Sequence, residues 1–161
     1  MSVTIDLRVV DPGAETYIDD AWRLKEQIHR NENVLKQRRG FFTDAYRRST
    51  VYALVQSGET DRLVGFAATR RDGYILFLAV DPEHRGEGLG GQLVAAVAED
   101  HDSVTCHARA TNEAAIEFYK HLGFNVERHI EGYYEDNGDA YYLRLGDAGL
   151  ATRLSRLVRG G

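Results

Sequence analysis

The sequence predicts an α/β domain of the α+β type, in which a mixed sheet of about seven strands is flanked by helices. Short runs with alternating apolar residues, many of them β-branched or aromatic, recur along the chain and are typical of strands. Longer stretches with apolar residues three and four positions apart lie between some of these runs and are typical of helices. The length of 161 residues and the hydrophobic content of 43% suit one compact core, which we assign to residues 1–146.

The first half of the chain predicts one strand, two helices and three further strands. The run TIDLRVV is typical of a strand that stops at Asp11-Pro12-Gly13, and residues 14–32 have helical spacing. Residues 34–48, VLKQRRGFFTDAYRR, indicate a second helix that is interrupted at Gly40. The runs TVYALVQ, RLVGFAATR and GYILFLAV follow with short turns between them, so we expect them to be antiparallel neighbours.

The second half alternates helices with strands and ends in a charged tail. GGQLVAAVAED and TNEAAIEFYKHL predict helices, the second with Thr111 or Asn112 as its N-cap, and SVTCHA between them predicts a strand. FNVERHI and DAYYLRL predict the last two strands, joined through the turn Asp136-Asn137-Gly138. Residues 147–161 place leucines on one face and arginines elsewhere, which indicates an amphipathic tail that caps the domain or frays.

Composition excludes several classes of function. The formal net charge of -5 argues against binding to nucleic acid, and no apolar run approaches the roughly 20 residues that cross a membrane. The single cysteine, Cys106, excludes an internal disulfide, and the histidines lack the spacing of metal ligands, so we expect no metal. The N-terminus has no basic-then-apolar signal sequence, so we expect a cytoplasmic protein. The sequence does not fix the oligomeric state.

A glycine-rich stretch, DPEHRGEGLGGQLV, precedes the first helix of the second half. Gly86, Gly88 and Gly91 match the dinucleotide fingerprint, but here five residues separate the strand from the first glycine and no ribose-binding acid ends the next strand. A triphosphate-binding loop would need a lysine after its last glycine, and Gln92 stands there. The remaining interpretations are a helix N-terminus that binds an anion with help from Arg85, and a loop that only turns the chain.

Two segments of this half resemble the GCN5-related N-acetyltransferases. Arg85-Gly86-Glu87-Gly88-Leu89-Gly90 has their R-x-x-G-x-G form, and ARATNEAAIEFYKHLGFNV is similar to their second conserved segment. The resemblance covers roughly Thr50 to Leu145 and implies acetyl-CoA as the acetyl donor. The residues that it implies for binding the donor are Leu78, Ala79, Val80, Arg85, Gly86, Glu87, Gly88, Leu89, Gly90, Gly91, Asn112 and Tyr119.

The same resemblance carries expectations about the fold and the acceptor. It implies a sheet that splays between its fourth and fifth strands, here GYILFLAV and SVTCHA, with the pantetheine arm of the donor in the split. The segment IEGYYEDNGDAYYLRL is similar to the end of the protein N-terminal acetyltransferases, including the ribosomal-protein acetyltransferases of bacteria. This implies a protein or peptide acceptor, with Tyr133, Tyr134 and Phe41 as candidates for binding it.

The chemistry requires a neutral amine, and three residues are candidates for catalysis. An α-amine with a pKa near 8 is about a tenth neutral at pH 7, so a modest base acting through water is sufficient. By resemblance, His107 is that base, Tyr74 holds the water with it, and Tyr119 protonates the departing thiolate. The alternatives are that Tyr74 covers a strand end, that His107 is a structural histidine and that Tyr119 only packs. Cys106 alternates with His107 along the strand, which argues against a cysteine nucleophile.

These observations favour one function and leave others open. The first hypothesis is direct transfer of acetyl from acetyl-CoA to a protein amine, with the N-terminal α-amine ahead of the lysine ε-amine. A protein lysine acetyltransferase and a small-molecule amine acetyltransferase remain alternatives, and the second of these predicts a sizeable acidic pocket. A module that senses acyl-CoA without turning it over is the alternative outside the enzymes.

Overall fold

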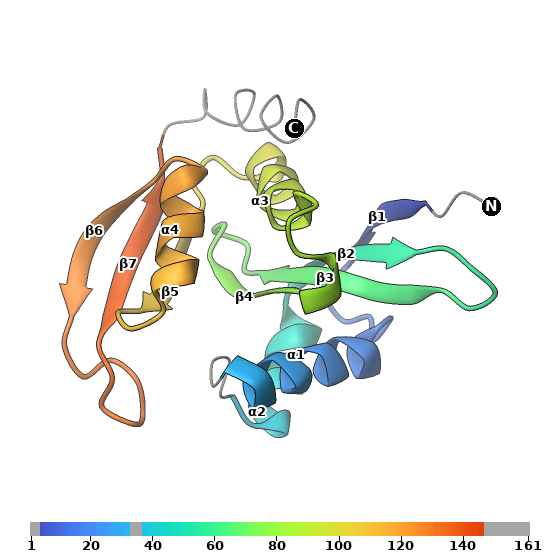
Figure 1. Ribbon diagram of the computed structural model, residues 1–161, viewed down its shortest axis with the longest axis horizontal. Coiled ribbons are helices and arrows are strands. Elements are labelled where there is room, and N and C mark those ends of the chain that lie inside the picture. The colour runs from blue at the N-terminus through green and yellow to red at the C-terminus, as the bar shows by residue number, and fades with distance from the viewer. Residues whose placement is uncertain (1–3, 33–36, 147–161) are drawn as a thin grey trace.

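The computed structural model describes residues 4–32 and 37–146, which form two antiparallel sheets and four α-helices (Figure 1). The first sheet has the order β1-β2-β3-β4 and the second the order β5-β7-β6. The strands are β1 (Ile5–Val10), β2 (Thr50–Gln56), β3 (Arg62–Thr69), β4 (Ile75–Val80), β5 (Thr105–Arg109), β6 (Phe124–Ile130) and β7 (Ala140–Leu145). The helices are α1 (Ile18–Glu32), α2 (Arg39–Arg48), α3 (Leu89–Asp100) and α4 (Glu113–His121), with a short 3-10 turn, η1 (Pro82–His84).

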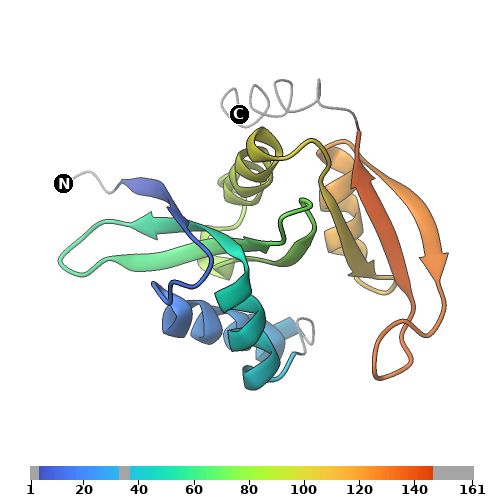
Figure 2. The same cartoon turned by 180° about the vertical axis from the view of Figure 1, so that it is seen from behind.

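The two sheets meet where β4 and β5 begin and then diverge. Tyr74 and Thr105 form an isolated parallel bridge, and the Thr105 N–H donates to the Gly73 carbonyl over 3.1 Å. Beyond this point β5 pairs with β7 and β4 pairs with β3, so neither strand pairs with the other. Figures 1 and 2 show the ribbons of the two sheets diverging from this point. The predicted splay between the fourth and fifth strands is therefore confirmed.

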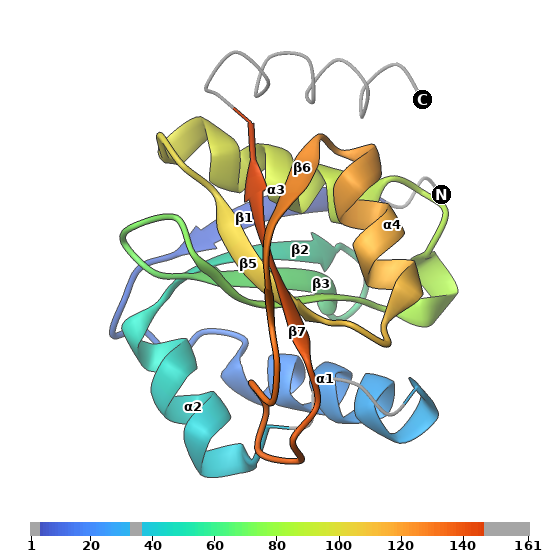
Figure 3. The same cartoon turned by 90° about the vertical axis from the view of Figure 1, so that its left-hand side faces the viewer.

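Two hydrophobic clusters hold the elements in place. The first lies between the two sheets and the helices α3 and α4, and it includes Leu54, Leu93 and Leu143. The second lies on the other face of the first sheet, under α1 and α2, where the Phe42 and Phe77 ring centroids are 4.9 Å apart. Figure 3 shows α3 and α4 on one side of the strands and α1 and α2 on the other. The two sides of the strands are thus covered by different pairs of helices.

The boundaries of the first two helices differ from those that the sequence predicts. The first helix begins at Ile18 rather than at residue 14, because Tyr17 has a positive φ of 65° and cannot continue a right-handed helix. The predicted interruption at Gly40 is wrong, since α2 begins at Arg39 and runs through Gly40. The segment 33–36 and the predicted amphipathic tail, 147–161, lie outside the described residues. Within residues 4–32 and 37–146, no helix is long and apolar enough to cross a membrane.

Candidate active site

The glycine-rich loop leads from β4 into α3 and is anchored at its start by Asp81. The buried Asp81 carboxylate accepts hydrogen bonds from the Glu83 N–H at 3.0 Å and from Arg62 at 2.8 Å. Gly86 and Gly88 have φ values of 86° and 78°, which glycine adopts without the steric cost that a Cβ brings. Both are exposed, and a Cβ on either would meet nothing within 4 Å. The outer side of this loop is therefore open to a ligand.

The first turn of α3 offers hydrogen-bond donors beside this loop. Gly88 is the N-cap of α3, and the first bond of the helix runs from the Gln92 N–H to the Gly88 carbonyl at 3.1 Å. The N–H groups of Leu89, Gly90 and Gly91 precede that bond and so have no partner within the helix. Such donors at a helix N-terminus attract anions, so this part of the predicted donor site has the chemistry for a pyrophosphate.

Gly90 is a glycine for a reason that the sequence did not indicate. A Cβ at Gly90 would lie 2.9 Å from the Phe118 ring of α4, closer than real Cβ atoms approach other atoms. The missing side chain therefore lets α3 and α4 pack together. Gly90 thus has a packing role besides the predicted role in binding the donor. The Gly90 N–H is still one of the donors in the first turn of α3 that have no partner within the helix.

The edge of β4 that faces the split carries the predicted donor residues Leu78, Ala79 and Val80. Their antiparallel partners lie on β3, with Ala79 opposite Phe66 and Val80 opposite Gly65. Beyond the bridge at Tyr74 the other edge of β4 pairs with no strand in the described part of the chain. Unpaired backbone groups at such an edge can bind an extended polar ligand.

Asn112, another predicted donor-binding residue, caps α4, since its side chain accepts a hydrogen bond from the Ala115 N–H at 3.2 Å.

The two faces of β5 carry different chemistry. Cys106 faces the core toward α4, where burial raises its pKa to about 12 and opposes formation of a thiolate. Tyr119 of α4 is 7% exposed and hydrogen bonds with the Cys106 thiol, and burial raises the pKa of its phenol. His107 is half-buried on the opposite face of β5. Tyr119 and His107 are therefore separated by the strand itself.

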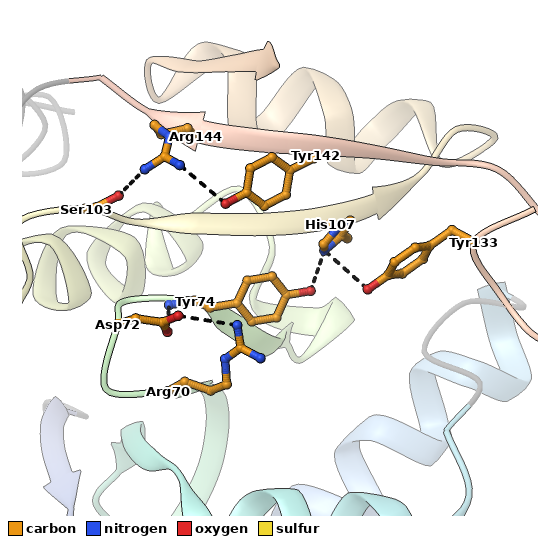
Figure 4. A network of polar contacts seen from close by, with 8 residues as sticks. All are labelled: Arg70, Asp72, Tyr74, Ser103, His107, Tyr133, Tyr142 and Arg144. Atoms are coloured by element: carbon orange, nitrogen blue, oxygen red, sulfur yellow. Dashed lines mark hydrogen bonds and ion pairs between the residues drawn. The ribbon is translucent and has the colours of Figure 1, made fainter. Parts of the chain in front are cut away.

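His107 lies at the centre of a cluster of aromatic side chains in the split (Figure 4). Its Nδ1 is 2.6 Å from the Tyr74 hydroxyl and 3.5 Å from the Tyr133 hydroxyl. The Tyr133 ring stacks on the imidazole with centroids 4.3 Å apart and planes 14° apart, and the Tyr142 ring lies 5.0 Å away. The structure thus brings together three of the predicted site residues, Tyr74, His107 and Tyr133, and adds Tyr142.

The charges around the cluster favour neutral His107. Burial lowers the pKa of His107, and the nearby positive charges of Arg128 and Arg70 lower it further. Burial, followed by the neighbouring Tyr133, raises the pKa of Tyr74 far above its usual value, so Tyr74 keeps its proton. Both groups are therefore neutral, and the tautomer that leaves the imidazole a free lone pair has Nδ1–H donating to the Tyr74 oxygen and Nε2 unprotonated. A neutral histidine can accept a proton at neutral pH.

The connection between β6 and β7, which carries Tyr133, is held against the end of β5 by an ion pair. Arg109 donates to both oxygens of Asp136 at 3.0 Å, and its guanidinium lies 4.0 Å from the centre of the Tyr134 ring. Burial raises the pKa of Tyr134 to about 12. These contacts hold the paired tyrosines of the hairpin beside His107. Phe41, the third predicted acceptor residue, is 57% exposed on α2 and makes no ring contact with the cluster in the described structure.

Sequence reasoning missed Tyr142, Arg70, Arg128 and Arg109. The alternation along DAYYLRL places Tyr142 on one face of its strand, but it does not say that His107 lies opposite. No group of three or more His, Cys, Asp or Glu side chains among the described residues could hold a metal ion.

One cavity bears on the small-amine alternative. It has a volume of about 280 Å³ and lies beside Asp81, at the end of β4 opposite Tyr74. The three aspartates that line it, Asp20, Asp61 and Asp81, each pair with an arginine. This cavity is therefore not an acidic pocket for a polycation.

Comparison with known proteins identifies related sequences. A family profile described as FR47-like protein matches residues 51–132, just over half of the chain. N-alpha-acetyltransferase 30 from Xenopus laevis is 39% identical over 80 residues, which are 47% of this chain and 29% of that protein. The human protein of the same name matches at the same identity over 22% of its length. The matched region is thus less than a third of these curated relatives.

Solved structures share the fold over most of the chain. The ribosomal-protein-S18-alanine N-acetyltransferase from Escherichia coli has a TM-score of 0.72 and 24% identity, with 88% of this chain and 93% of that chain covered. Arabidopsis thaliana NAA60 in complex with a bisubstrate analogue has a TM-score of 0.66 and 25% identity, with 88% and 98% covered. These likenesses agree with the two splayed sheets described above.

Proposed function

Since this chain belongs to the FR47-like family of GCN5-related N-acetyltransferases, we propose that it transfers acetyl from acetyl-CoA to the N-terminal α-amine of a protein. The observation that carries the proposal is the 2.6 Å contact between Tyr74 and a neutral His107, beside the stacked Tyr133, in the split between the sheets. The sequence relatives named N-alpha-acetyltransferase 30 support the same reaction.

The features of this chain fit acetyl-CoA. The loop at Gly86 and Gly88 is open, the first turn of α3 has free N–H groups, and the edge of β4 is unpaired in the split. We assign the pyrophosphate to the loop and the α3 N-terminus, and the pantetheine amides to the β4 edge. Acetyl-CoA supplies the acetyl group as a thioester, which an amine converts into an amide with release of a thiol.

Residues of the chain accept and donate the protons of this reaction. Nε2 of His107 takes the proton of the attacking amine, directly or through water, and Tyr74 holds the imidazole by the hydrogen bond at Nδ1. Tyr119 keeps its phenolic proton and is available to the departing sulfur on the other face of β5. Since base and acid act from opposite faces of one strand, the amine and the donor approach the split from opposite sides.

The α-amine is the better acceptor for this site. A lysine with a pKa near 10.4 is neutral in only about four molecules per ten thousand at pH 7, against about a tenth of α-amines. The site offers a single imidazole and uncharged phenols within hydrogen-bond distance, without a carboxylate among those contacts. This supports an acceptor that needs only modest deprotonation. The protein acceptor and the cytoplasmic location stay predictions.

A peptide assay tests the proposal. The protein is mixed with acetyl-CoA and either peptides with a free N-terminus and no lysine, or N-terminally blocked peptides that contain lysine. Thiol release and mass spectrometry report the reaction, and we expect acetylation of the free N-termini. Acetylation of only the blocked lysine peptides would replace the proposal with a lysine acetyltransferase, and tight acetyl-CoA binding without thiol release would replace it with a sensor.

A further inference from the structure

A row of three side chains crosses the face of the second sheet that carries His107, and it ends in an arginine. The strand register places Tyr142 of β7 opposite both His107 of β5 and Arg128 of β6. The Tyr142 ring contacts the His107 ring at 5.0 Å, and the Arg128 guanidinium lies over the Tyr142 ring at 5.2 Å. These two distances place the guanidinium no more than about 10 Å from the imidazole.

Arg128 has no carboxylate partner within the described residues, although acidic side chains are close along the chain. Glu127 pairs with Arg144, Asp136 pairs with Arg109, and Asp139 pairs with His129. Arg128 is exposed, and its guanidinium lies over the face of Tyr142. A guanidinium on an aromatic ring is held in one orientation while its N–H donors stay available to an oxygen ligand.

A second arginine stands on the other side of His107. The Arg70 guanidinium lies 4.3 Å from the centre of the Tyr74 ring and 3.4 Å from an Asp72 oxygen. Arg70 and Arg128 thus face the cluster from the first and the second sheet, and both positive charges act on His107. A protein of net charge -5 therefore presents cations beside the group that receives the amine. Such a field favours an acceptor that carries negative charge.

We propose that Arg128, supported by Tyr142, selects acceptors with an acidic side chain at the second or third residue. This rests on the proposed function, because it assumes that an α-amine lies at His107. An extended peptide advances about 3.3 Å per residue, so the second and third residues start about 3 and 7 Å beyond the first, and their side chains reach a guanidinium no more than about 10 Å from the imidazole. Arg128 then forms a charge-assisted hydrogen bond with the carboxylate of the acceptor.

Paired peptides that differ at one residue test the inference. Each pair carries Glu or Gln at the second or the third residue, with the rest identical and free of lysine, and kcat/KM is measured by thiol release. We expect the Glu peptide of at least one pair to be preferred about 3- to 30-fold, from the usual strength of exposed and charge-assisted contacts. The preference should fall at high salt, since the pair is partly exposed.

Variants of the protein assign the preference to Arg128. In Arg128→Gln the ratio of Glu to Gln peptides should fall toward one, and in Arg128→Glu a peptide with Lys at that residue should become preferred. Arg23→Gln is the matched control, because Arg23 is an exposed arginine of α1 paired with Asp20, and its ratio should equal that of the unaltered protein. Circular dichroism checks that each variant is folded.

The outcomes separate this inference from the proposed function. Acetylation of all free N-termini with equal kcat/KM for Glu and Gln peptides would overturn the inference and leave the proposed function in place. A preference for Glu peptides that is unchanged in Arg128→Gln would also overturn the inference and leave the proposed function in place. Absence of acetylation on every free N-terminus would instead overturn the proposed function.

Discussion

The hydrogen bond between Tyr74 and His107 predicts strong coupling between substitutions at these two residues. His107→Ala removes the group that accepts the amine proton, and a general base contributes about 100- to 10,000-fold to the rate. That loss is about 2.7 to 5.4 kcal/mol in activation free energy. Tyr74→Phe keeps the ring and removes only the hydroxyl that hydrogen bonds with Nδ1 at 2.6 Å. One hydrogen bond contributes about 0.5 to 1.5 kcal/mol, so we expect a loss of about 2- to 13-fold.

The double variant should lose about as much activity as His107→Ala alone. Once the imidazole is gone, the Tyr74 hydroxyl has nothing to orient, so its removal costs little more. The assay is kcat/KM for an N-terminal peptide at saturating acetyl-CoA, measured by thiol release for the four proteins of the cycle. Tyr142→Phe is the control, since the Tyr142 hydroxyl contacts Arg144 rather than Nδ1 and its coupling to His107 should be smaller.

Two results would refute parts of this reasoning. If the losses of Tyr74→Phe and His107→Ala add in free energy, the two groups act independently, and the contact at 2.6 Å has no role in the reaction. If Tyr74→Phe costs as much as His107→Ala, the phenol itself relays the amine proton and does more than position the histidine.

Three further predictions follow from the charges and the packing around the site. Arg128→Gln removes a positive charge that lowers the pKa of His107, so the rising limb of the pH–rate profile should move to higher pH. Coulomb's law at about 10 Å gives a shift of about 0.3 to 1 unit, and a limb that moves to lower pH would contradict the assignment. Tyr119→Phe should lower turnover without moving that limb or the acetyl-CoA dissociation constant, and a shifted limb would mean that Tyr119 is coupled to the base. Gly90→Ala should lower the free energy of unfolding by about 1 to 3 kcal/mol, because its Cβ meets the Phe118 ring at 2.9 Å. Thermal denaturation measures that loss, and Phe118→Leu should recover part of it if the clash is the cause.

The strands and helices follow largely from local patterns. Alternation and helical spacing depend on residues close in sequence, which is why the second half of the chain was predicted nearly element by element. The errors occur where backbone conformation at one residue decides the outcome. Tyr17 takes a left-handed conformation that a tyrosine rarely adopts, and Gly40 sits in the first turn of α2, where a glycine is tolerated.

The sequence by itself determined three features: the loop glycines with positive φ, the alternation that places His107 and Cys106 on opposite faces of one strand, and the tyrosine pair of the last hairpin. Each of these depends on the chain within a few residues. Only the tertiary structure decided which side chains meet. The row from His107 through Tyr142 to Arg128 requires the register of three strands, including the irregularity between Val126 and Arg128. A shift of one residue would turn every side chain of a strand to the other face, so local sequence alone could not specify this contact.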